Sequence, residues 1–323
     1  MLIDILLLIL GLSLLTGGGE MLVRGASALA RSMGVSPLVV GLTVVAFGTS
    51  APELSVNVAA ALKGQSDISF GNIMGSSIAN IGLIVGATAL VRPLQIHTNV
   101  IVREIPMMLL ASAATLVICM DRAMGSGEDS FSQADGAVLL LFFAVFIYYT
   151  IQDALRQRGV PSQEESSPKR SIPFDLLLIA LGLGGLVLGG RVTVSSAEDI
   201  ALAIGVSEVV IGLTVVAIGT SLPELVTALI ATSRGQSDLA MGNVVGSNIF
   251  NLLFVLGITA TIRPIAIPEG GGLDLAVMIV LAVALLPLSF NPKRSIGRTA
   301  GAVLLLLYFA YIAWRTVGGH SSQ

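Results

Sequence analysis

GLTVVAFGTSAPEL at residues 41–54 recurs as GLTVVAIGTSLPEL at residues 212–225, with only two substitutions. The two copies continue without a gap over residues 41–94 and 212–265, where 28 of the 54 aligned positions are identical. Both copies are apolar, yet each has Gly, Pro and Glu in the middle of its hydrophobic run. Repeated hydrophobic segments interrupted by Gly and Pro at corresponding positions are typical of the binding site of a secondary transporter.

The composition is that of a membrane protein. The chain is 54% hydrophobic and 11% charged, whereas a soluble domain has about 25% charged residues, so we expect most of its surface to face lipid. A single cysteine, Cys119, excludes an internal disulfide. Only two histidines, His97 and His320, leave no cluster for a zinc or haem site. The apolar run 2–16 lacks the positive region of a secretory signal, which predicts a retained helix.

Ten segments of the chain have the length and the apolar character of a membrane-spanning helix, which needs about 20 residues. The longest polar stretch, residues 153–171, contains GVPSQEESSPKR and is predicted to be a linker loop. It separates a first five-helix half, residues 1–152, from a second five-helix half, residues 172–323. The predicted fold is therefore an all-α integral membrane protein with ten transmembrane helices, at 2–22, 37–62, 70–91, 99–120, 134–152, 172–190, 208–232, 241–262, 272–290 and 298–317.

Positive charges predict the orientation of these helices. Cytoplasmic loops carry an excess of Lys and Arg, and the charges divide 12 to 5 in favour of an outside N-terminus. Both termini are therefore expected outside a plasma or inner membrane, with the linker in the cytoplasm. Because each half has an odd number of helices, the two halves should form an inverted pair. The inner side has Arg24, Arg31, Arg92, Arg103, Arg156, Arg158, Lys169, Arg170, Arg234, Lys293, Arg294 and Arg298, and the outer side has Lys63, Arg122, Arg191, Arg263 and Arg315.

Glu53 and Glu224 lie about midway through the second and seventh predicted helices. A carboxylate near the bilayer centre costs several kcal/mol unless it is paired or solvated, which makes it a functional-site candidate. The alternative is a protonated, hydrogen-bonded glutamate, but the same costly residue at equivalent positions of both repeats argues against it. Pro52 and Pro223 precede the two glutamates and should interrupt both helices at membrane depth.

Residues that can supply oxygen ligands flank both glutamates in the sequence. Interrupted helices would expose carbonyls near Gly48 and Gly219, and a non-helical backbone at this depth is tolerated where it lines a cavity. The alternative is a simple proline kink, at which Thr and Ser hydroxyls bond to the freed backbone groups. The presence of the same motif with Glu in both repeats argues against this alternative. Such a set of hard oxygens suits Ca2+ and Na+. The carbonyls belong to Ala46, Phe47, Ala217 and Ile218, the hydroxyls to Thr49, Ser50, Thr220 and Ser221, and the following helices add Ser76, Asn80, Ser247 and Asn251 at a spacing of four.

These motifs, GTSAPE with GNIMGSSIAN and GTSLPE with GNVVGSNIFN, resemble the two α-repeats of the Ca2+/cation antiporter superfamily, most closely its prokaryotic Na+/Ca2+ exchanger branch. The resemblance implies that Glu53 and Glu224 are the main ion ligands. It also implies that the first and sixth helices slide to alternate access. The assisting ligands would be Thr49, Ser50, Thr220, Ser221, Ser76, Ser247, Asn80 and Asn251, with the backbone oxygens of Ala46 and Ala217 completing the Na+ positions.

This chain differs from two other branches of the superfamily at positions that indicate which ion is coupled to Ca2+ transport. The K+-dependent branch has Asp where this chain has Asn251, so K+ cotransport is not expected. The H+-coupled branch has Glu in the segments that here contain Ser76 and Ser247, which favours Na+ coupling. The resemblance therefore predicts electrogenic, K+-independent Na+/Ca2+ antiport. H+-coupled or K+-dependent antiport is the nearest alternative.

A Ca2+-selective channel and an intramembrane enzyme are more distant alternatives. Channels usually build a ring of carboxylates from several subunits, whereas one chain supplies both halves here. The sequence has no HExxH motif and no cysteine nucleophile at a motif, so no enzyme activity is expected. We expect no cofactor, no nucleic acid and no obligate protein partner. The expected partners are Ca2+ and Na+ as substrates and the lipid bilayer.

Overall fold

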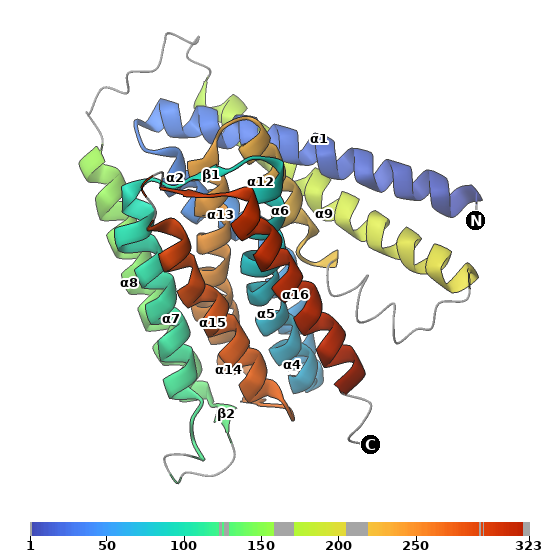
Figure 1. Ribbon diagram of the computed structural model, residues 1–323, viewed down its shortest axis with the longest axis vertical. Coiled ribbons are helices and arrows are strands. Elements are labelled where there is room, and N and C mark those ends of the chain that lie inside the picture. The colour runs from blue at the N-terminus through green and yellow to red at the C-terminus, as the bar shows by residue number, and fades with distance from the viewer. Residues whose placement is uncertain are drawn as a thin grey trace.

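A computed structural model describes residues 2–122, 125, 129–157, 171–204, 219–290, 292 and 294–318. Nearly all of these residues are helical, as Figure 1 shows. The first half contains α1 (Leu2–Met33), α2 (Pro37–Val40), the π-helix η1 (Gly41–Val45), α3 (Ala46–Thr49), α4 (Ala51–Lys63), α5 (Ser66–Ala79), the π-helix η2 (Asn80–Val85), α6 (Gly86–Val91), β1 (Leu94–Gln95), the π-helix η3 (Val100–Glu104), α7 (Ile105–Ile118), β2 (Ser130–Phe131) and α8 (Gln133–Gln157). The second half contains α9 (Ile172–Ala203), α12 (Leu222–Ser233), α13 (Ser237–Ile249), the π-helix η5 (Phe250–Val255), α14 (Leu256–Ile262), β3 (Ile265–Ala266), α15 (Gly271–Ser289), β4 (Ser295–Ile296) and α16 (Arg298–Gly318).

The helices have the length and apolar character of membrane spans. Within the described residues, seven helices meet this criterion, or eight if the bent pair 37–49 and 51–63 is one span. The prediction of an all-helical membrane protein is confirmed at this level, and the count of ten stays a prediction. Most of the predicted linker and part of the seventh predicted helix, at 158–170 and 205–218, lie outside the described residues.

Three helices extend well beyond their predicted C-terminal ends. α1 continues to Met33 instead of ending near residue 22, α8 continues to Gln157 instead of residue 152, and α9 continues to Ala203 instead of residue 190. Arg24 interrupts the apolar run of α1, but its guanidinium pairs with Glu20 one turn earlier, at 2.7 Å. An ion pair at this i, i+4 spacing stabilises a helix. Arg24 therefore does not end the helix.

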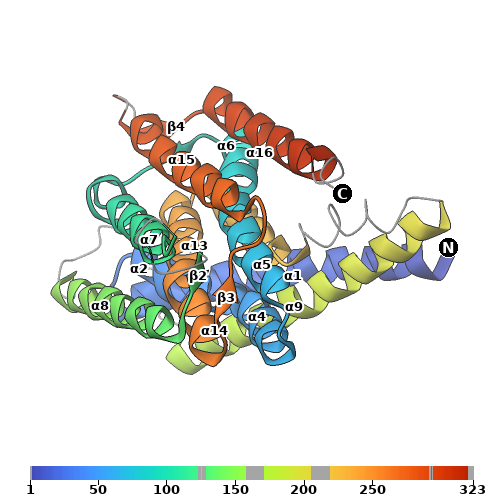
Figure 2. The same ribbon diagram turned by 90° about the horizontal axis from the view of Figure 1, so that it is seen from below.

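Glycines allow a close contact between α1 and α9. A Cβ added to Gly18 would lie 2.8 Å from the carbonyl oxygen of Gly182, and one added to Gly189 would lie 2.8 Å from that of Gly11. The two backbones therefore approach each other closely along antiparallel axes, which only small residues permit. α1 and α9 lie side by side, and the N-terminal end of α1 and the C-terminal end of α9 project from the other helices (Figure 1 and Figure 2).

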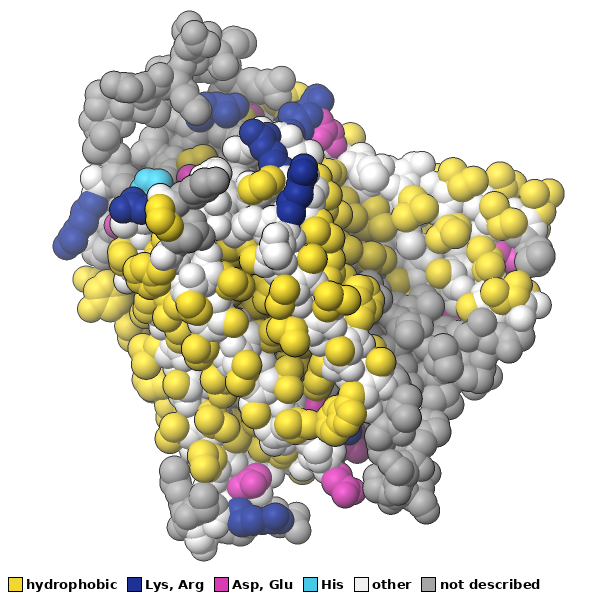
Figure 3. All heavy atoms as spheres, viewed as in Figure 1, with side chains coloured by type: hydrophobic (Ala, Val, Ile, Leu, Met, Phe, Trp, Pro, Cys, Tyr) yellow, Lys and Arg dark blue, Asp and Glu magenta, His cyan; other side chains and the backbone are white. Residues whose placement is uncertain are grey.

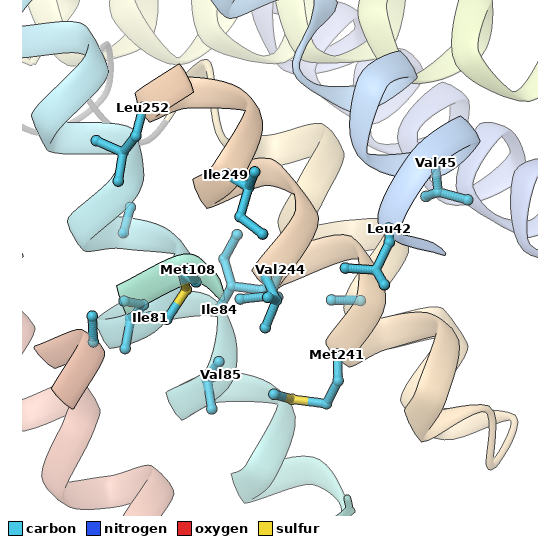
Figure 4. Packing of buried hydrophobic residues seen from close by; sticks show 14 of the residues in the cluster. Leu42, Val45, Ile81, Ile84, Val85, Met108, Met241, Val244, Ile249 and Leu252 are labelled. Atoms are coloured by element: carbon cyan, nitrogen blue, oxygen red, sulfur yellow. The ribbon is translucent and has the colours of Figure 1, made fainter. Parts of the chain in front are cut away.

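The segments α5–α6 and α13–α14 form the centre of the helix bundle. Both are mostly buried, whereas the outer helices expose many apolar side chains. Figure 4 shows Val244 of α13 beside Ile84 of η2, with Met108 of α7 close to Ile81 and Ile84. Hydrophobic side chains cover the middle of the face in Figure 3, and Lys and Arg side chains gather near its upper end. An apolar belt with charges at its ends is the distribution that a bilayer requires.

Two short antiparallel ladders join the halves. β1 pairs with β4, with Leu94 opposite Ile296, and β2 pairs with β3, with Phe131 opposite Ile265. Each ladder therefore connects a loop of the first half with a loop of the second. The ladders hold the ends of the two repeats to the opposite half of the molecule.

Two glycine–arginine contacts repeat at the offset of 171. Gly64 and Gly235 follow α4 and α12, with φ angles of 74° and 76°, a conformation that favours glycine. A Cβ on Gly64 would lie 2.8 Å from Nη1 of Arg263, and one on Gly235 would lie 3.2 Å from Nη1 of Arg92. The turn after the first helix of each repeat is thus covered by the arginine that ends the other repeat.

Candidate ion-binding site

The helix break predicted in the first repeat lies at Ser50. α3 ends at Thr49, α4 begins at Ala51, and the helical segments on either side are bent by 44°. Ser50 has φ −84° and ψ 4°, and Ser221, which precedes α12, has φ −89° and ψ 5°. The two repeats therefore share one backbone conformation at this point. Each proline lies in the first turn of the new helix, where its missing N–H group costs nothing.

Glu53 and Glu224 lie in the first turns of α4 and α12, where the helix dipole favours negative charge. Both side chains are only 1% exposed. Ser50 of the first half donates its hydroxyl to Oε1 of Glu224 at 3.1 Å, and its Oγ lies 3.1 Å from Oγ of Ser247. The break of the first repeat is therefore in direct contact with the carboxylate of the second.

Two asparagines form a second pair of site residues. Asn251 donates from Nδ2 to Oγ of Ser76 at 3.0 Å, which joins the two repeats again. Asn80 donates from Nδ2 to Oδ1 of Asn248 at 3.4 Å. Asn80 begins η2, and Asn251 is the second residue of η5. The widened turn of a π-helix occurs frequently at functional sites, and here it coincides with both asparagines.

Several buried oxygens of these residues lack a hydrogen-bond partner within the described part of the chain. A buried acceptor without a donor costs about 1–3 kcal/mol, and a cation is the partner that would satisfy several acceptors at once. The unsatisfied oxygens at the site are Oε2 of Glu53, Oε2 of Glu224, Oδ1 of Asn80, Oδ1 of Asn251 and Oγ of Ser221.

Some sequence-predicted ligands have other contacts. The carbonyl oxygen of Ala46 accepts from the amide of Ser50 at 3.0 Å and from the hydroxyl of Thr49 at 3.4 Å, because the helix remains intact up to Thr49. The break at Ser50 therefore does not free this carbonyl as expected. Thr220 is only half-buried, and Ala217 lies outside the described residues.

Further asparagines support the site without being among the sequence-predicted ligands: Asn57 and Asn243 are buried, and Asn72 is partly exposed. Asn243 lies with Oδ1 3.1 Å from the hydroxyl of Thr49, and Asn72 accepts from Nδ2 of Asn57 at 2.7 Å. Asn72 and Asn243 are equivalent in the two repeats and precede Ser76 and Ser247 by four residues. The helical spacing of four, together with the duplication, was the signal that would have found them.

The chemistry of the site is that of hard oxygen ligands. Two carboxylates from opposite halves are combined with neutral amides and hydroxyls. Among the described residues, no three His, Cys, Asp or Glu side chains lie together in a way that could hold a metal ion. Oxygen ligands with few fixed charges suit Ca2+ and Na+ better than a transition metal.

Apolar helices that enclose hard oxygens from both halves define a membrane transporter of cations. The sodium/calcium exchanger protein family matches residues 3–152 and 174–317, and the chain therefore belongs to this family. The family consists of transporters, not enzymes. Membership in it supports cation/Ca2+ antiport as the activity of this chain.

Relatives match the chain over nearly its whole length. The putative antiporter CaxA of Alkalimonas amylolytica is 37% identical, over 96% of this chain and 98% of that protein. The sodium/calcium exchanger MaX1 of Methanosarcina acetivorans is 32% identical, over 96% of this chain and 97% of that protein. A solved structure of the sodium-calcium exchanger NCX_Mj, soaked with 10 mM Na+ and zero Ca2+, superimposes with a TM-score of 0.83 at 34% identity, covering 97% of this chain and 99% of that one.

Proposed function

We propose that this protein exchanges Na+ for Ca2+ across the cell membrane, and that the site formed by Glu53, Glu224 and the residues around them, called the pocket below, binds both ions in turn. The observation that carries the proposal is the set of buried, unsatisfied oxygens on Glu53, Glu224, Asn80 and Asn251. These four residues are two pairs related by the offset of 171. A site with acceptors on both sides favours a cation over water, because one water molecule can donate only two hydrogen bonds whereas one Ca2+ takes about six to eight oxygen ligands.

The two negative charges of the pocket support the exchange of more than one Na+ for each Ca2+. Two carboxylates are balanced by one Ca2+, whereas monovalent ions must enter in larger number to balance the same charge. The hydroxyl oxygens of Ser50 and Ser221 suit the smaller charge of Na+. Asn251 adds no third carboxylate, so the pocket lacks the extra field that we expect a K+ site to need. We therefore infer electrogenic exchange that does not depend on K+.

The loop contacts support ten spans in two inverted halves, and the division of Lys and Arg supports both termini outside. β1 and β4 belong to two loops that this topology places inside, and β2 and β3 to two loops that it places outside. Arg103 pairs with Asp153 at 2.9 Å, again between two inner segments. Two halves related by inversion would meet in this way, each repeat end pairing with the other half. The division into residues 1–152, a cytoplasmic linker 153–171 and residues 172–323 follows from the same topology.

The contact between α1 and α9 supports alternating access by sliding of these helices. Their shared interface is lined by glycines, which present a smooth surface with few interlocking side chains. Each helix is also the first of its half, and each contacts the broken helices of the site. Movement of the pair would open the pocket to one side at a time.

Transport in reconstituted vesicles tests the proposal. Vesicles loaded with Na+ and diluted into Ca2+ should take up Ca2+, and the uptake should build a membrane potential. Replacing internal Na+ by Li+ or K+ should abolish uptake, and external K+ should leave it unchanged. Uptake that requires K+, or that runs on a pH gradient without Na+, would overturn the Na+ coupling. Flux that needs no counter-ion would favour a channel instead.

A further inference from the structure

The amide of Asn80 must present its oxygen, not its nitrogen, to a bound cation. An asparagine side chain has nearly the same shape in both orientations, but the flipped form would direct two N–H donors at the ion. Hydrogen bonds to the neighbours therefore decide which atom faces the pocket. For Asn80, these bonds begin at a residue outside the repeats.

Met108 of α7 is the start of a one-way chain of hydrogen bonds. A thioether sulfur accepts a hydrogen bond but has none to give. Asn248 donates from Nδ2 to Sδ of Met108 at 3.5 Å, which turns its Oδ1 toward Asn80 at 3.4 Å from Nδ2. The nitrogen of Asn80 is thus occupied, and its Oδ1 has no donor among the described residues. All three side chains are at most 1% exposed, so water does not compete for these bonds.

A different series of hydrogen bonds, which also ends at a group that only accepts, orients Asn251. The carbonyl oxygen of Asn72 accepts the hydroxyl of Ser76 at 2.7 Å, so Oγ of Ser76 is left to accept from Nδ2 of Asn251 at 3.0 Å. Each site asparagine is therefore fixed by a group that can only accept: a backbone carbonyl for Asn251 and a thioether for Asn80. The two chains do not use equivalent residues.

The second repeat differs from the first at the residue that joins Met108 to the site. Asn248 corresponds to Ser77, which donates its hydroxyl back to Ile73 of its own helix at 2.8 Å. Met108 itself has a counterpart, Met278 of α15. The buried residues of α7 and α15 follow the same spacing, and the two methionines occupy the same position in it. The second half therefore repeats the methionine, but Ser77, the residue equivalent to Asn248, has no amide to donate.

We infer that Met108 and Asn248 are positioning residues, which hold the amide of Asn80 with its oxygen toward the bound cation. The inference rests on the proposed function of the pocket. If the sulfur acceptor is removed, Asn248 is free to turn its nitrogen toward Asn80, and Asn80 then turns a donor toward the ion. Loss of an outer-shell partner typically costs a metal site about 10- to 100-fold in affinity.

Met108→Leu, which keeps the volume and removes the acceptor, tests the inference against Met278→Leu. In Na+-loaded vesicles, Met108→Leu should raise the KM for Ca2+ by roughly tenfold, with little change in the maximal rate. Met278→Leu should leave the KM at the wild-type value. Equal KM values for the two variants would overturn the positioning role. Absence of Na+-driven Ca2+ uptake by the wild-type protein would instead overturn the proposed function.

A double-mutant cycle with Asn80→Asp separates orientation from packing. A carboxylate presents an oxygen in either orientation, so adding Met108→Leu to Asn80→Asp should not raise the KM further. The same increase in both backgrounds would show that Met108 acts through packing alone and would contradict the inference. If Asn80→Asp does not transport, Ca2+-induced rises in the melting temperature of the purified variants give the same comparison.

Discussion

Glu53 and Glu224 carry the two charges of the candidate site, and each lies at the start of a helix with one unsatisfied oxygen. Burial of two carboxylates is costly for stability, and the proposed cation would offset that cost. Glu104 is a buried carboxylate of a different kind, because it pairs with Arg103 at 2.9 Å. The contrast between these glutamates separates a binding role from a structural one.

Replacing either site glutamate by glutamine should abolish exchange. Glu53→Gln and Glu224→Gln keep the volume but remove the charge that Ca2+ needs after it loses its water. The melting temperature should hold or rise, because an uncharged amide is cheaper to bury than a carboxylate. Na+-driven Ca2+ uptake and thermal unfolding of the purified protein measure the two effects. Near-normal uptake by either variant would remove that residue from the site.

Glu104→Gln is the matched control for these variants. It breaks an ion pair with Arg103, which retains Asp153 at 2.9 Å as a second partner. We expect uptake to persist and stability to fall by about 1–2 kcal/mol, a typical cost for disturbing a buried polar contact. Loss of uptake with an unchanged melting temperature would place Glu104 in the transport mechanism.

Asn251→Asp should change ion selectivity more than it changes folding. The carboxylate would add a third negative charge beside Ser76 and strengthen the field on a monovalent cation. We expect the K+ dependence of uptake, or the ratio of Na+ to Ca2+ transported, to differ from the wild type. Parallel flux measurements with and without K+ decide the matter, and identical ion dependence would argue against a direct role of Asn251.

At the scale of elements, the structure depends on two kinds of helix contact. The broken helices place polar residues of one half against those of the other, and the glycine contact between α1 and α9 keeps these two helices close. In this contact, neighbouring glycines have opposite surroundings. A Cβ on Gly18 would lie 2.7 Å from the backbone nitrogen of Leu186, whereas a Cβ on Gly17 would meet nothing within 4 Å.

Gly18→Ala should therefore impair the protein where Gly17→Ala does not. The added methyl group must push α1 away from α9, at a cost of about 1–3 kcal/mol, and we expect slower transport as well. Gly17→Ala should be neutral or stabilise α1 by up to about 1 kcal/mol. Thermal unfolding and Ca2+ uptake of both variants provide the test. Equal behaviour of the two alanines would mean that the close contact does not limit movement or stability.

At the scale of the whole molecule, orientation in the membrane is the property that decides which side each loop serves. The 12-to-5 division of Lys and Arg predicts an outside N-terminus. The β1–β4 and β2–β3 ladders join loops that this topology places on the same side. The ladders support the pairing of loops on one side, whereas the predicted orientation rests on the charge count alone.

Single-cysteine labelling tests this orientation. In a Cys119→Ala background, an impermeant reagent added to intact cells should label Gly125→Cys in a predicted outer loop. It should not label Glu165→Cys in the predicted cytoplasmic linker until the cells are permeabilised. Labelling of position 165 in intact cells would overturn the topology, and with it the side that each repeat faces.

The sequence by itself determined the class of protein, the duplicated motif and the two carboxylates, because hydropathy and an exact offset of 171 are properties of the chain alone. It also located the break near Pro52, since a proline removes a backbone hydrogen bond and clashes with the preceding turn, although Pro287 lies inside α15 without ending it. Only the tertiary structure showed that Ser50 contacts Glu224, that Asn251 contacts Ser76, and that Met108 is linked to Asn80 through Asn248. These partners are far apart in the sequence and meet because the two repeats pack against each other, so no local pattern encodes the pairing.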